Sequence, residues 1–388
     1  MQNFEFHTPT RVIFGQDTER QIGEVVAGYG FRRVLLVYGS GSIKRSGLYA
    51  TVTDSLARAG IAYAEHGGVK ANPLLSHTLE GIAVAKRERA ELIIGVGGGS
   101  VIDTAKEIAI GALDSGDHWD FATGKRRVER ALPVGVILTI AAAGSEMSES
   151  AVLTNEADGS KRGYNTPFHR PLFAICNPAL TFSVDRYQTA CGIVDILMHT
   201  LERYFAPMPE TPVTDALAMA LCRETVRAGR VAYENPNDYG ARASLMWASS
   251  LSHNGLTGAG RAFVSSCHKL EHEMSAKYDV AHGAGLAVIF PAWAEYVMPY
   301  AYGRFARFAR EVFAVTPSDD EAAAKEGLRI LRSFFRSIGM PLTFGELGIP
   351  VPDLEDMALR ASAGKTFAIK SYTELGYDEM LAIYRLAL

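Results

Sequence analysis

The sequence predicts an α/β domain followed by an all-helical domain. In the first half, short β-branched runs alternate with amphipathic stretches at about 30-residue spacing, which is typical of βαβ units in an open parallel sheet. Beyond Leu180 the chain has almost only helical periodicity, in Ala-rich stretches such as TDALAMALCRETVRAG. A chain of 388 residues is also too long for one typical core. We therefore expect two domains, over residues 1–180 and 181–388.

The strands expected in the first half are short and apolar. RVLLVYG at 33–39 and LIIGVGGGS at 92–100 are continuous apolar runs, typical of strands buried on both faces of a parallel sheet. VLTNEADGSKRGYN at 152–165 predicts a hairpin with Asp158-Gly159 as its turn. Further strands are expected at 11–15, 61–63, 132–138 and 172–176, and helices at 17–26, 47–59 and 75–87.

The composition is that of an ordinary globular protein, with 48% hydrophobic and 21% charged residues. A net charge of −4 provides no basic surface for nucleic acid or anionic lipid. The four cysteines form no CxxC pair, which argues against a disulfide scaffold and a zinc ribbon. The first residues lack a signal-peptide pattern and no apolar run approaches the roughly 20 residues of a membrane span, so we expect a cytoplasmic protein.

Histidines and a carboxylate recur at helical spacing in the second half. His268 and His272 in CHKLEHEMSAKYDVAHG are four residues apart and project from one face of a helix. Asp195 and His199 repeat this spacing in the apolar GIVDILMHTLERY, where burying them unpaired costs several kcal/mol. A divalent metal held by Asp195, His199 and two of the later histidines, with His282 on a glycine-flanked loop, would satisfy these groups.

Structural roles for the same residues compete with a metal site. A single histidine on an apolar face is more often a hydrogen-bonded core residue, and Asp195 with His199 alone fits an ion pair within a helix. The second pair at the same spacing favours the metal. The spacing leaves open which of the later histidines bind and which metal they hold.

Two glycine-rich turns follow expected strands. GVGGGSVIDTAK, at 95–106, follows a buried strand and opens a helix, a context in which backbone amides can approach a phosphate. Ser100 is the expected N-cap of this helix, and Asp103 is in a capping-box position. A tight turn without a ligand is the alternative. GSGSIKRSG, at 39–47, lacks the acidic residue that binds the adenosine ribose of NAD, and its small and basic residues suit the 2′-phosphate of NADP(H). These residues are Gly39, Ser40, Ser42, Lys44 and Arg45.

Four segments of the chain together carry a family resemblance. They are, in order, GGGSVIDTAK, LTIAAAGSEMS, GIVDILMHTLERY and HKLEHEMSAKYDVAHG. With these segments the chain resembles the iron-containing (group III) alcohol dehydrogenases. Within this family the chain looks most like the NADPH-dependent butanol dehydrogenases and broad-specificity aldehyde reductases. The likeness extends from HTPTRVIFG to YDEMLAIYRLAL, essentially the whole chain. It implies an α/β dinucleotide-binding (Rossmann-like) domain and an all-α C-terminal domain, as in the dehydroquinate synthase-like fold. It also implies NADP(H), one Fe²⁺ or Zn²⁺ and a homodimer.

The resemblance also assigns roles to residues of this sequence. It implies that His272 is the catalytic residue, unligated beside the nicotinamide. The implied metal ligands are Asp195, His199, His268 and His282. The implied cofactor-binding residues are Gly39, Ser40 and Ser42 at the adenosine ribose, Gly97, Gly98, Gly99 and Ser100 at the pyrophosphate, and Asn72, Asp103, Thr139 and Lys161 at further contacts. Many relatives have Pro and Thr where this chain has Ala141 and Ala143, a departure that leaves the cofactor and substrate contacts there unassigned.

This site predicts hydride transfer between NADPH and short- to medium-chain aldehydes, with the metal polarising the carbonyl and His272 in the proton relay. The reducing direction is expected to dominate. Three alternatives remain open. They are a glycerol-type polyol dehydrogenase, a dehydroquinate synthase-like lyase, and a binding protein that senses the nucleotide without turnover.

Overall fold

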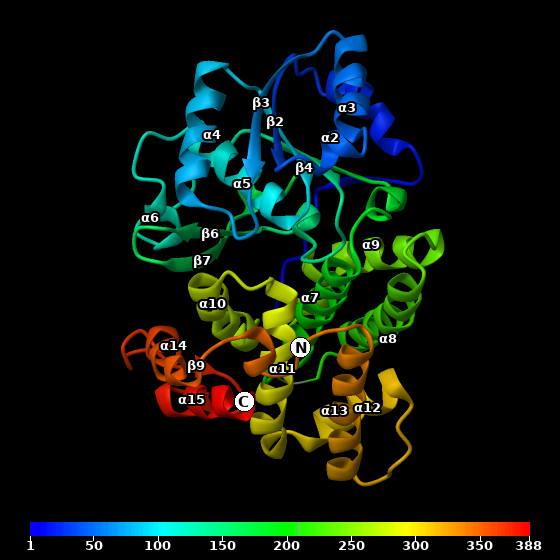
Figure 1. The fold of residues 1–388 in the computed structure, drawn as a ribbon, viewed down its shortest axis with the longest axis vertical. Helices are drawn as coiled ribbons and strands as arrows, with labels where there is room; N and C mark the ends of the chain where they lie inside the picture. Colours follow the sequence, from blue (N-terminus) through cyan, green and yellow to red (C-terminus); the bar gives the residue numbers. More distant parts are fainter. Residues whose placement is uncertain (209) are drawn as a thin grey trace. The chain divides into compact units, whose positions relative to one another are not determined.

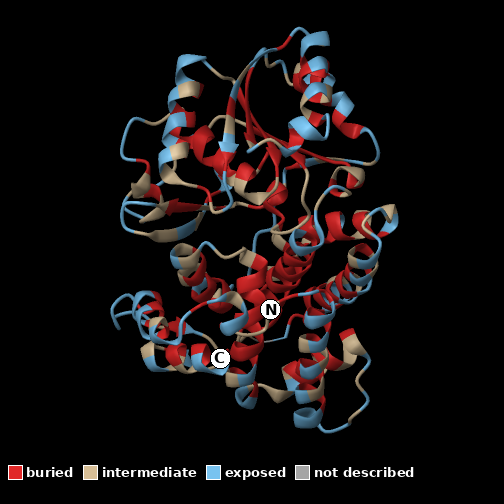
Figure 2. Cartoon of the chain, viewed as in Figure 1, coloured by how far each residue is buried: buried red, intermediate tan, exposed pale blue. Residues whose placement is uncertain are grey.

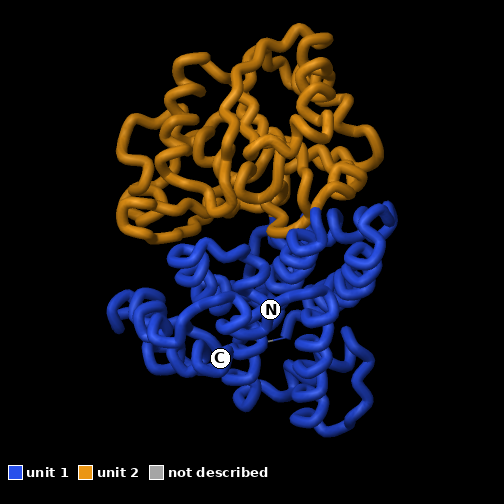
Figure 3. Tube along the Cα trace, in the orientation of Figure 1, with its two compact units in different colours: residues 1–6, 185–388 blue, residues 7–184 orange. Residues whose placement is uncertain are grey.

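The computed structural model describes residues 1–208 and 210–388 and forms two compact units, coloured separately in Figure 3. The α/β unit comprises His7–Val184, and the helical unit comprises Asp185–Leu388 together with Met1–Phe6. The backbone N–H of Gln2 donates to the carbonyl oxygen of Gly260 at 2.8 Å, which places the amino-terminal segment in the helical unit. The sequence predicts these six residues in the first domain.

The α/β unit is built on a six-stranded sheet in the order β1-β8-β5-β4-β2-β3. Strands β2, β3 and β4 of this sheet are labelled in Figure 1. Every pair of neighbouring strands runs parallel. The chain order reverses at β2, since β3 lies on one side of it and β4 on the other, so the carboxyl ends of β2 and β4 flank a topological switch point. The strands are β1 (Arg11–Phe14), β2 (Arg33–Gly39), β3 (Ala62–Val69), β4 (Leu92–Gly97), β5 (Val134–Leu138) and β8 (Phe173–Cys176).

Alternate residues of β4 face opposite helical layers. Leu92, Ile94 and Val96 join the apolar core beneath α1 and α3. Gly95 and Gly97 face α5, and a Cβ on Gly97 would lie 2.6 Å from Cγ2 of Val101, so glycine allows α5 to pack closely on the sheet. The inner strands β2, β4, β5 and β8 and the helix α5 are largely buried (Figure 2). The helices of this unit are α1 (Ile22–Gly28), α2 (Ser42–Arg45), α3 (Leu48–Arg58), α4 (Leu75–Arg87), α5 (Gly99–Gly111) and α6 (Trp119–Ala122).

The hairpin predicted at 152–165 is present as β6 (Ser150–Asn155) and β7 (Ser160–Asn165), which pair antiparallel. Buried polar contacts attach it to α5. Nζ of Lys106 donates to the carbonyl oxygen of Ser150 at 2.8 Å, and the hydroxyl of Tyr164 donates to Oε2 of Glu107 at 2.9 Å. The hairpin is therefore fixed on the helix that begins at the glycine-rich turn.

The helical unit is arranged around α7 (Arg186–Tyr204) and α11 (His282–Val297), which are buried along almost their whole length (Figure 2). A continuous apolar run, from Ala284 to Ala294, explains the burial of α11. No described helix is both long and apolar enough to cross a membrane. The other elements are α8 (Pro212–Glu234), α9 (Tyr239–His253), α10 (Ser266–Tyr278), α12 (Tyr302–Phe313), α13 (Asp320–Ser337), α14 (Leu354–Ala361), α15 (Tyr377–Leu386), β9 (Ile369–Lys370) and β10 (Glu374–Leu375).

Candidate functional site

Four of the predicted side chains converge within the helical unit. Asp195 and His199 lie one turn apart on α7, His268 lies on the first turn of α10, and His282 begins α11. The Nε2 atoms of the three histidines all approach one oxygen, Oδ1 of Asp195. The distances are 3.4 Å from His199, 3.9 Å from His268 and 3.8 Å from His282.

These spacings fit a divalent metal ion. Ligand–metal distances of about 2.0–2.2 Å place the ligand atoms of a tetrahedral site roughly 3.4 Å apart. Nε2 of His268 is buried and has no hydrogen-bond partner among the described residues. One carboxylate and three imidazoles form a donor set suited to Fe²⁺ or Zn²⁺. The side chain of Asp195 is 7% exposed and that of His282 is 26% exposed, so the centre is more accessible beside His282.

Two carboxylates absent from the sequence prediction contact these rings from behind. Oε2 of Glu202 accepts a hydrogen bond from Nδ1 of His268, and Oε2 of Glu271 accepts one from Nδ1 of His282. Both carboxylates are buried. The sequence carried a signal for Glu202, which lies three residues after His199 and on the same face of α7. Carboxylates in this position are the usual outer partners of metal-binding histidines.

Burial and neighbouring groups shift the ring pKa values in different directions. Burial lowers the pKa of His199 well below its ordinary value, and the nearby ring of His253, stacked at 4.1 Å between centroids, lowers it further. Burial would also lower the pKa of His268, but the adjacent Glu202 carboxylate outweighs it and raises that pKa. A neutral His199 is in the protonation state that a metal ligand requires.

His272 lies one turn after His268 on α10, with its ring centroid 5.9 Å from that of His282. One ring nitrogen each of His272 and His282 and a carboxylate oxygen of Glu271 lie within 4.8 Å of one another. A second group at this spacing consists of Asp195, His268 and His282. The structure thus places His272 beside the centre, in a half-exposed position. Its catalytic role remains a prediction.

Two glycines allow α11 to bring His282 to the centre. A Cβ on Gly283 would lie 2.1 Å from the carbonyl oxygen of Cys191 on α7. A Cβ on Gly285 would lie 2.7 Å from Cγ of Glu271 on α10. Glycine at these two positions is therefore what allows α11 to contact both neighbouring helices.

The predicted nucleotide-binding residues of the α/β unit lie largely along the carboxyl edge of the sheet. Gly39 ends β2 and Gly97 ends β4, at the topological switch point. Thr139 follows β5, and its N–H donates to the carbonyl oxygen of Gly97 at 3.0 Å. Ser40 lies in the turn after β2, and Ser42 begins α2. Gly98 caps α5, and Gly99 and Ser100 belong to its first turn, whose amides suit a phosphate.

Asn72 and Lys161 come from separate segments and meet. Nζ of Lys161, on β7, donates to Oδ1 of Asn72 at 2.9 Å. Asn72 has a φ of 54°, a left-handed conformation that asparagine tolerates better than most residues. The contact holds the loop after β3 against the hairpin.

The capping expected at the start of α5 is wrong. Gly98 is the N-cap, no side chain caps the helix, and Ser100 lies within the first turn. The carboxylate of Asp103 instead accepts hydrogen bonds from Oγ of Ser145 at 2.6 Å and from the N–H of Val152 at 3.0 Å. Burial raises the pKa of Asp103. Asp103 thus holds the loop after β5 and the hairpin to α5, and its cofactor contact remains a prediction.

Lys44, expected to be available to a phosphate, is engaged beside the turn. Its Nζ lies 3.8 Å from Oε2 of Glu65 on β3, and over the rings of Tyr38 and Tyr49 at 5.1 and 4.8 Å from their centroids. Arg45 is exposed. The positive charge near Gly39 is therefore partly compensated by Glu65.

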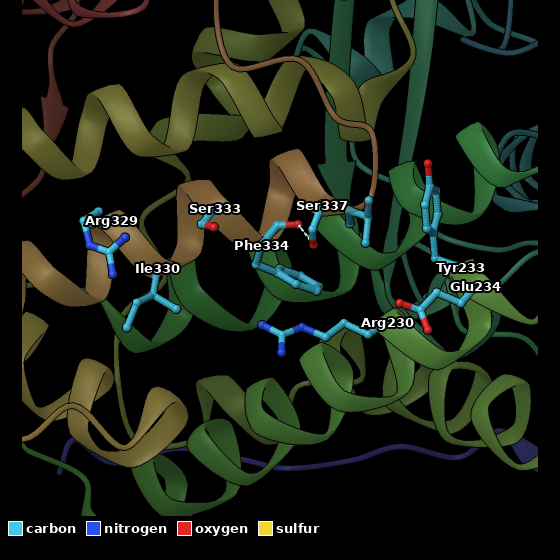
Figure 4. A pocket seen from close by; sticks show the side chains of 9 residues that line it. Arg230, Tyr233, Glu234, Arg329, Ile330, Ser333, Phe334 and Ser337 are labelled. Atoms are coloured by element: carbon cyan, nitrogen blue, oxygen red, sulfur yellow. Dashed lines mark hydrogen bonds between the residues drawn. The ribbon is translucent and has the colours of Figure 1, made fainter.

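A separate groove of about 310 Å³ lies between α8 and α13 in the helical unit (Figure 4). Phe334 and Ile338 form part of its wall, and the guanidinium of Arg230 lies over the Phe334 ring at 5.5 Å from the centroid. Its lining contains no histidine or cysteine among the described residues. The groove therefore does not compete with the histidine cluster as a metal site.

Comparison with known proteins agrees with this arrangement. Residues 9–178 match the model of the family described as iron-containing alcohol dehydrogenase, and residues 189–388 match that of the Fe-containing alcohol dehydrogenase family, C-terminal. The chain is 38% identical to NADH-dependent butanol dehydrogenase A of Clostridium acetobutylicum over 99% of both chains. It is 31% identical to the NADPH-dependent aldehyde reductase YqhD of Escherichia coli over 90% of both. The crystal structure of NADH-dependent butanol dehydrogenase A from Thermotoga maritima superposes with a TM-score of 0.96 at 38% identity, covering 100% of this chain and 99% of that one.

Proposed function

Because the chain belongs to the iron-containing alcohol dehydrogenase family, whose members named above are NAD(P)-dependent oxidoreductases, we propose that it reduces short- to medium-chain aldehydes with NADPH. The reaction uses a divalent metal held by Asp195, His199, His268 and His282. The observation that carries this proposal is the approach of three Nε2 atoms to within 3.9 Å of one carboxylate oxygen. The family assignment argues against the lyase and the nucleotide sensor.

The residues of the helical unit bind and orient the reacting groups. A divalent ion in this position supplies Lewis-acid polarisation of a carbonyl oxygen, and the nicotinamide supplies the hydride. Asp195, His199 and His268 are buried, which limits the access of water to the donor set. The greater exposure of His282 leaves room for the substrate on the remaining side.

His272 supplies the proton in this proposal. Its ring is half-exposed and lies beside His282, so it can exchange a proton with solvent without leaving the site. Replacing His272 with Ala is expected to lower turnover while the bound metal is retained. Loss of the metal in this variant would instead assign His272 to the ligand set.

Metal removal tests the proposed function. Enzyme stripped by a chelator is expected to lose turnover of butanal with NADPH, followed by nicotinamide absorbance, and to regain it with Fe²⁺ or Zn²⁺. A panel of aldehydes, glycerol and propanediol separates aldehyde reduction from polyol oxidation. Full activity of the metal-free protein, or turnover of polyols alone, would contradict the proposal.

The choice of NADPH rests on Gly39. A carboxylate at this strand end would repel the 2′-phosphate, and glycine removes that repulsion. Because Glu65 partly compensates Lys44, we expect a preference of only about tenfold over NADH, equivalent to one hydrogen bond to a charged group. The names of the relatives include both coenzymes, so this property requires its own measurement.

The test of coenzyme choice is the substitution Gly39→Asp. A Cβ there would lie 3.5 Å from the carbonyl oxygen of Val69, an ordinary contact, so the aspartate fits. The variant is expected to lose NADPH-dependent kcat/KM and to keep or gain the NADH-dependent value. Equal kcat/KM for both coenzymes in the unmodified enzyme would show that Gly39 does not select between them.

We also propose a homodimer formed through β1. This strand pairs with β8 on one side, and no other described strand pairs with it, which leaves an edge that a second copy can extend. The N–H groups of Arg11 and Gly15 point to β8, so by alternation that of Val12 points away. Val12→Pro is expected to shift the dimer to monomer in analytical ultracentrifugation with the sheet intact. An unchanged dimer would place the interface elsewhere.

A further inference from the structure

We propose that Glu202 and Glu271 are positioning residues that hold His268 and His282 in the one imidazole tautomer able to bind metal through Nε2. This inference rests on the proposed metal role of the four ligands and extends it to two residues that contact no substrate or metal. It concerns the position of one ring proton on each histidine. An ionised carboxylate can only accept hydrogen bonds, so the ring nitrogen that faces it must carry the proton.

Glu202 connects the metal centre to the start of a helix. Its Oε1 accepts hydrogen bonds from the backbone N–H groups of Cys267 and His268, two of the amides left unpaired at the start of α10. Its Oε2 accepts from Nδ1 of His268. One side chain from α7 thus caps α10 and fixes the ring proton on Nδ1. Nε2 of His268 is then left with a lone pair directed at the centre.

Glu271 does the same for His282 from α10. Its Oε2 accepts from Nδ1 of His282, and its Oε1 accepts from the hydroxyl of Ser275 one turn later. The absence of a side chain on Gly285 leaves room for the Glu271 carboxylate. The carboxylate is fully buried and is held from two sides, so it cannot turn away from the ring.

His199 differs from His268 and His282, whose Nδ1 atoms donate to buried carboxylates. Its Nδ1 is buried and has no hydrogen-bond partner among the described residues, and its ring is stacked on that of His253. Stacking restricts the plane of the ring but does not select a tautomer. The structure therefore has two histidines prepared for metal and one whose tautomer is set only when the ion binds.

The test removes the acceptor that faces each ring, in Glu202→Gln and Glu271→Met. At 202 the amides of Cys267 and His268 hold the one glutamine oxygen, so its N–H₂ group faces Nδ1 and favours the proton on Nε2, where it blocks the metal. At 271 a glutamine could turn its oxygen to Nδ1 and its N–H₂ group to the Ser275 hydroxyl, so methionine is used there. Affinity for Co²⁺, measured by chelator competition, is expected to fall about 10- to 100-fold in each variant. Glu273→Gln is the matched control on α10, because Glu273 pairs with Arg360 at 2.8 Å and not with a histidine. Its affinity is expected to match that of the unmodified protein.

The tautomer itself is read in metal-free protein by ¹⁵N resonances of labelled histidine rings. The Nδ1–H forms of His268 and His282 are expected in the unmodified protein. The Nε2–H form replaces that of His268 in Glu202→Gln, and a mixture of tautomers replaces that of His282 in Glu271→Met. Glu271 caps no helix, so its variant reports on the tautomer even if Glu202→Gln unfolds α10. Unchanged tautomers and Co²⁺ affinity in a folded variant would overturn the inference. Failure of the unmodified protein to bind Co²⁺ would refute the proposed function, whereas the ¹⁵N spectra would still decide this proposal.

Discussion

Each unit of the molecule contains a buried cluster of histidines and carboxylates, and the two clusters use the ring nitrogens in opposite ways. In the α/β unit, the carboxylate of Glu107 lies at the middle, with Nε2 of His118 at 2.7 Å and Nε2 of His169 at 3.3 Å. In the helical unit, Glu202 and Glu271 lie outside the cluster and contact Nδ1. There the Nε2 atoms face inward.

The difference separates a structural cross-link from the proposed ligand set, which is made of the same residue types. Glu107 on α5 joins the segment before α6 through His118, and β7 through Tyr164, so its bonds tie elements together. Burial would raise its pKa, but the hydrogen bond from His118 and the nearby ring of His169 lower the pKa of Glu107 to about 2. In the helical unit the carboxylates orient the rings without occupying the nitrogens that meet at the centre. A carboxylate that contacts Nε2 forms a cross-link, whereas a carboxylate that contacts Nδ1 leaves Nε2 available to a metal.

The largest expected effect comes from removing one histidine from each cluster. If four ligands share the roughly 10–16 kcal/mol typical of zinc sites, His268→Ala weakens metal binding on the order of 100- to 1,000-fold and abolishes turnover. His118→Ala should leave the metal in place and destabilise the α/β unit by about 1–3 kcal/mol, because it leaves buried Glu107 short of a donor. Metal analysis and chemical unfolding of both variants check this. Metal loss in His118→Ala would remove the distinction between the clusters.

The acid stability of the α/β unit follows from Glu107. Its pKa is lower in the folded than in the unfolded chain, so its contribution is complete above pH ~4.5 and is lost as the pH falls towards 2. A shift of this size corresponds to about 3 kcal/mol. Urea unfolding between pH 7 and 3 is expected to reveal this loss, and Glu107→Gln should flatten the pH dependence. An equally steep profile in the variant would attribute the acid sensitivity to other groups.

The approach of α11 to α7 can be changed by one methyl group. Gly283→Ala places a Cβ against the carbonyl oxygen of Cys191, and the shift of α11 is expected to cost about 1–3 kcal/mol and to weaken metal binding through His282. Gly28→Ala is the control, because a Cβ there meets nothing within 4 Å. Thermal unfolding and chelator competition measure the two consequences. A Gly283→Ala protein with unchanged metal affinity would show that α11 adapts without moving His282.

The smallest expected effect concerns the hydroxyl behind Glu271. Ser275→Ala removes one donor from that carboxylate but leaves its bond to His282, so metal affinity should fall by about threefold, within the range of one modest hydrogen bond. Ser252→Ala on α9 removes a buried hydroxyl that donates to the Ser249 carbonyl oxygen at 2.7 Å. It is expected to affect stability similarly and metal affinity not at all. Equal metal affinities of the two variants would show that the Ser275 hydroxyl does not help to position Glu271.

The shared face of Asp195 and His199 could be inferred from the sequence because helix geometry makes spacing informative, whereas the choice of His268 and His282 over His272 came from the family resemblance. Residues four apart on α7 share a face, so Asp195 and His199 had to point the same way. Glu271 could not be found in this way. It lies among charged residues on α10, and its partner His282 reaches it only because Asp279, with a φ of 52°, ends the helix and turns the chain.

Other misses have local causes. Serine is a residue type preferred at N-caps, which favoured Ser100. However, β4 ends at Gly97 and the helix begins at Gly99, so the N-cap is Gly98. β3 extends to Val69 although only a short strand was expected at 61–63. It is an edge strand with exposed polar residues and glycines, which hide the apolar pattern of a buried strand.

The attachment of residues 1–6 to the helical unit sets an order of events during synthesis. The α/β unit is an insertion between Phe6 and Asp185, so it can fold as soon as its last strand has left the ribosome. Gln2 must then wait for Gly260, whose codon is read much later. The amino-terminal segment therefore remains tethered to a folded unit, without its own partner, for most of translation. Ribosome-bound chains that stop before Gly260 should expose it to proteases.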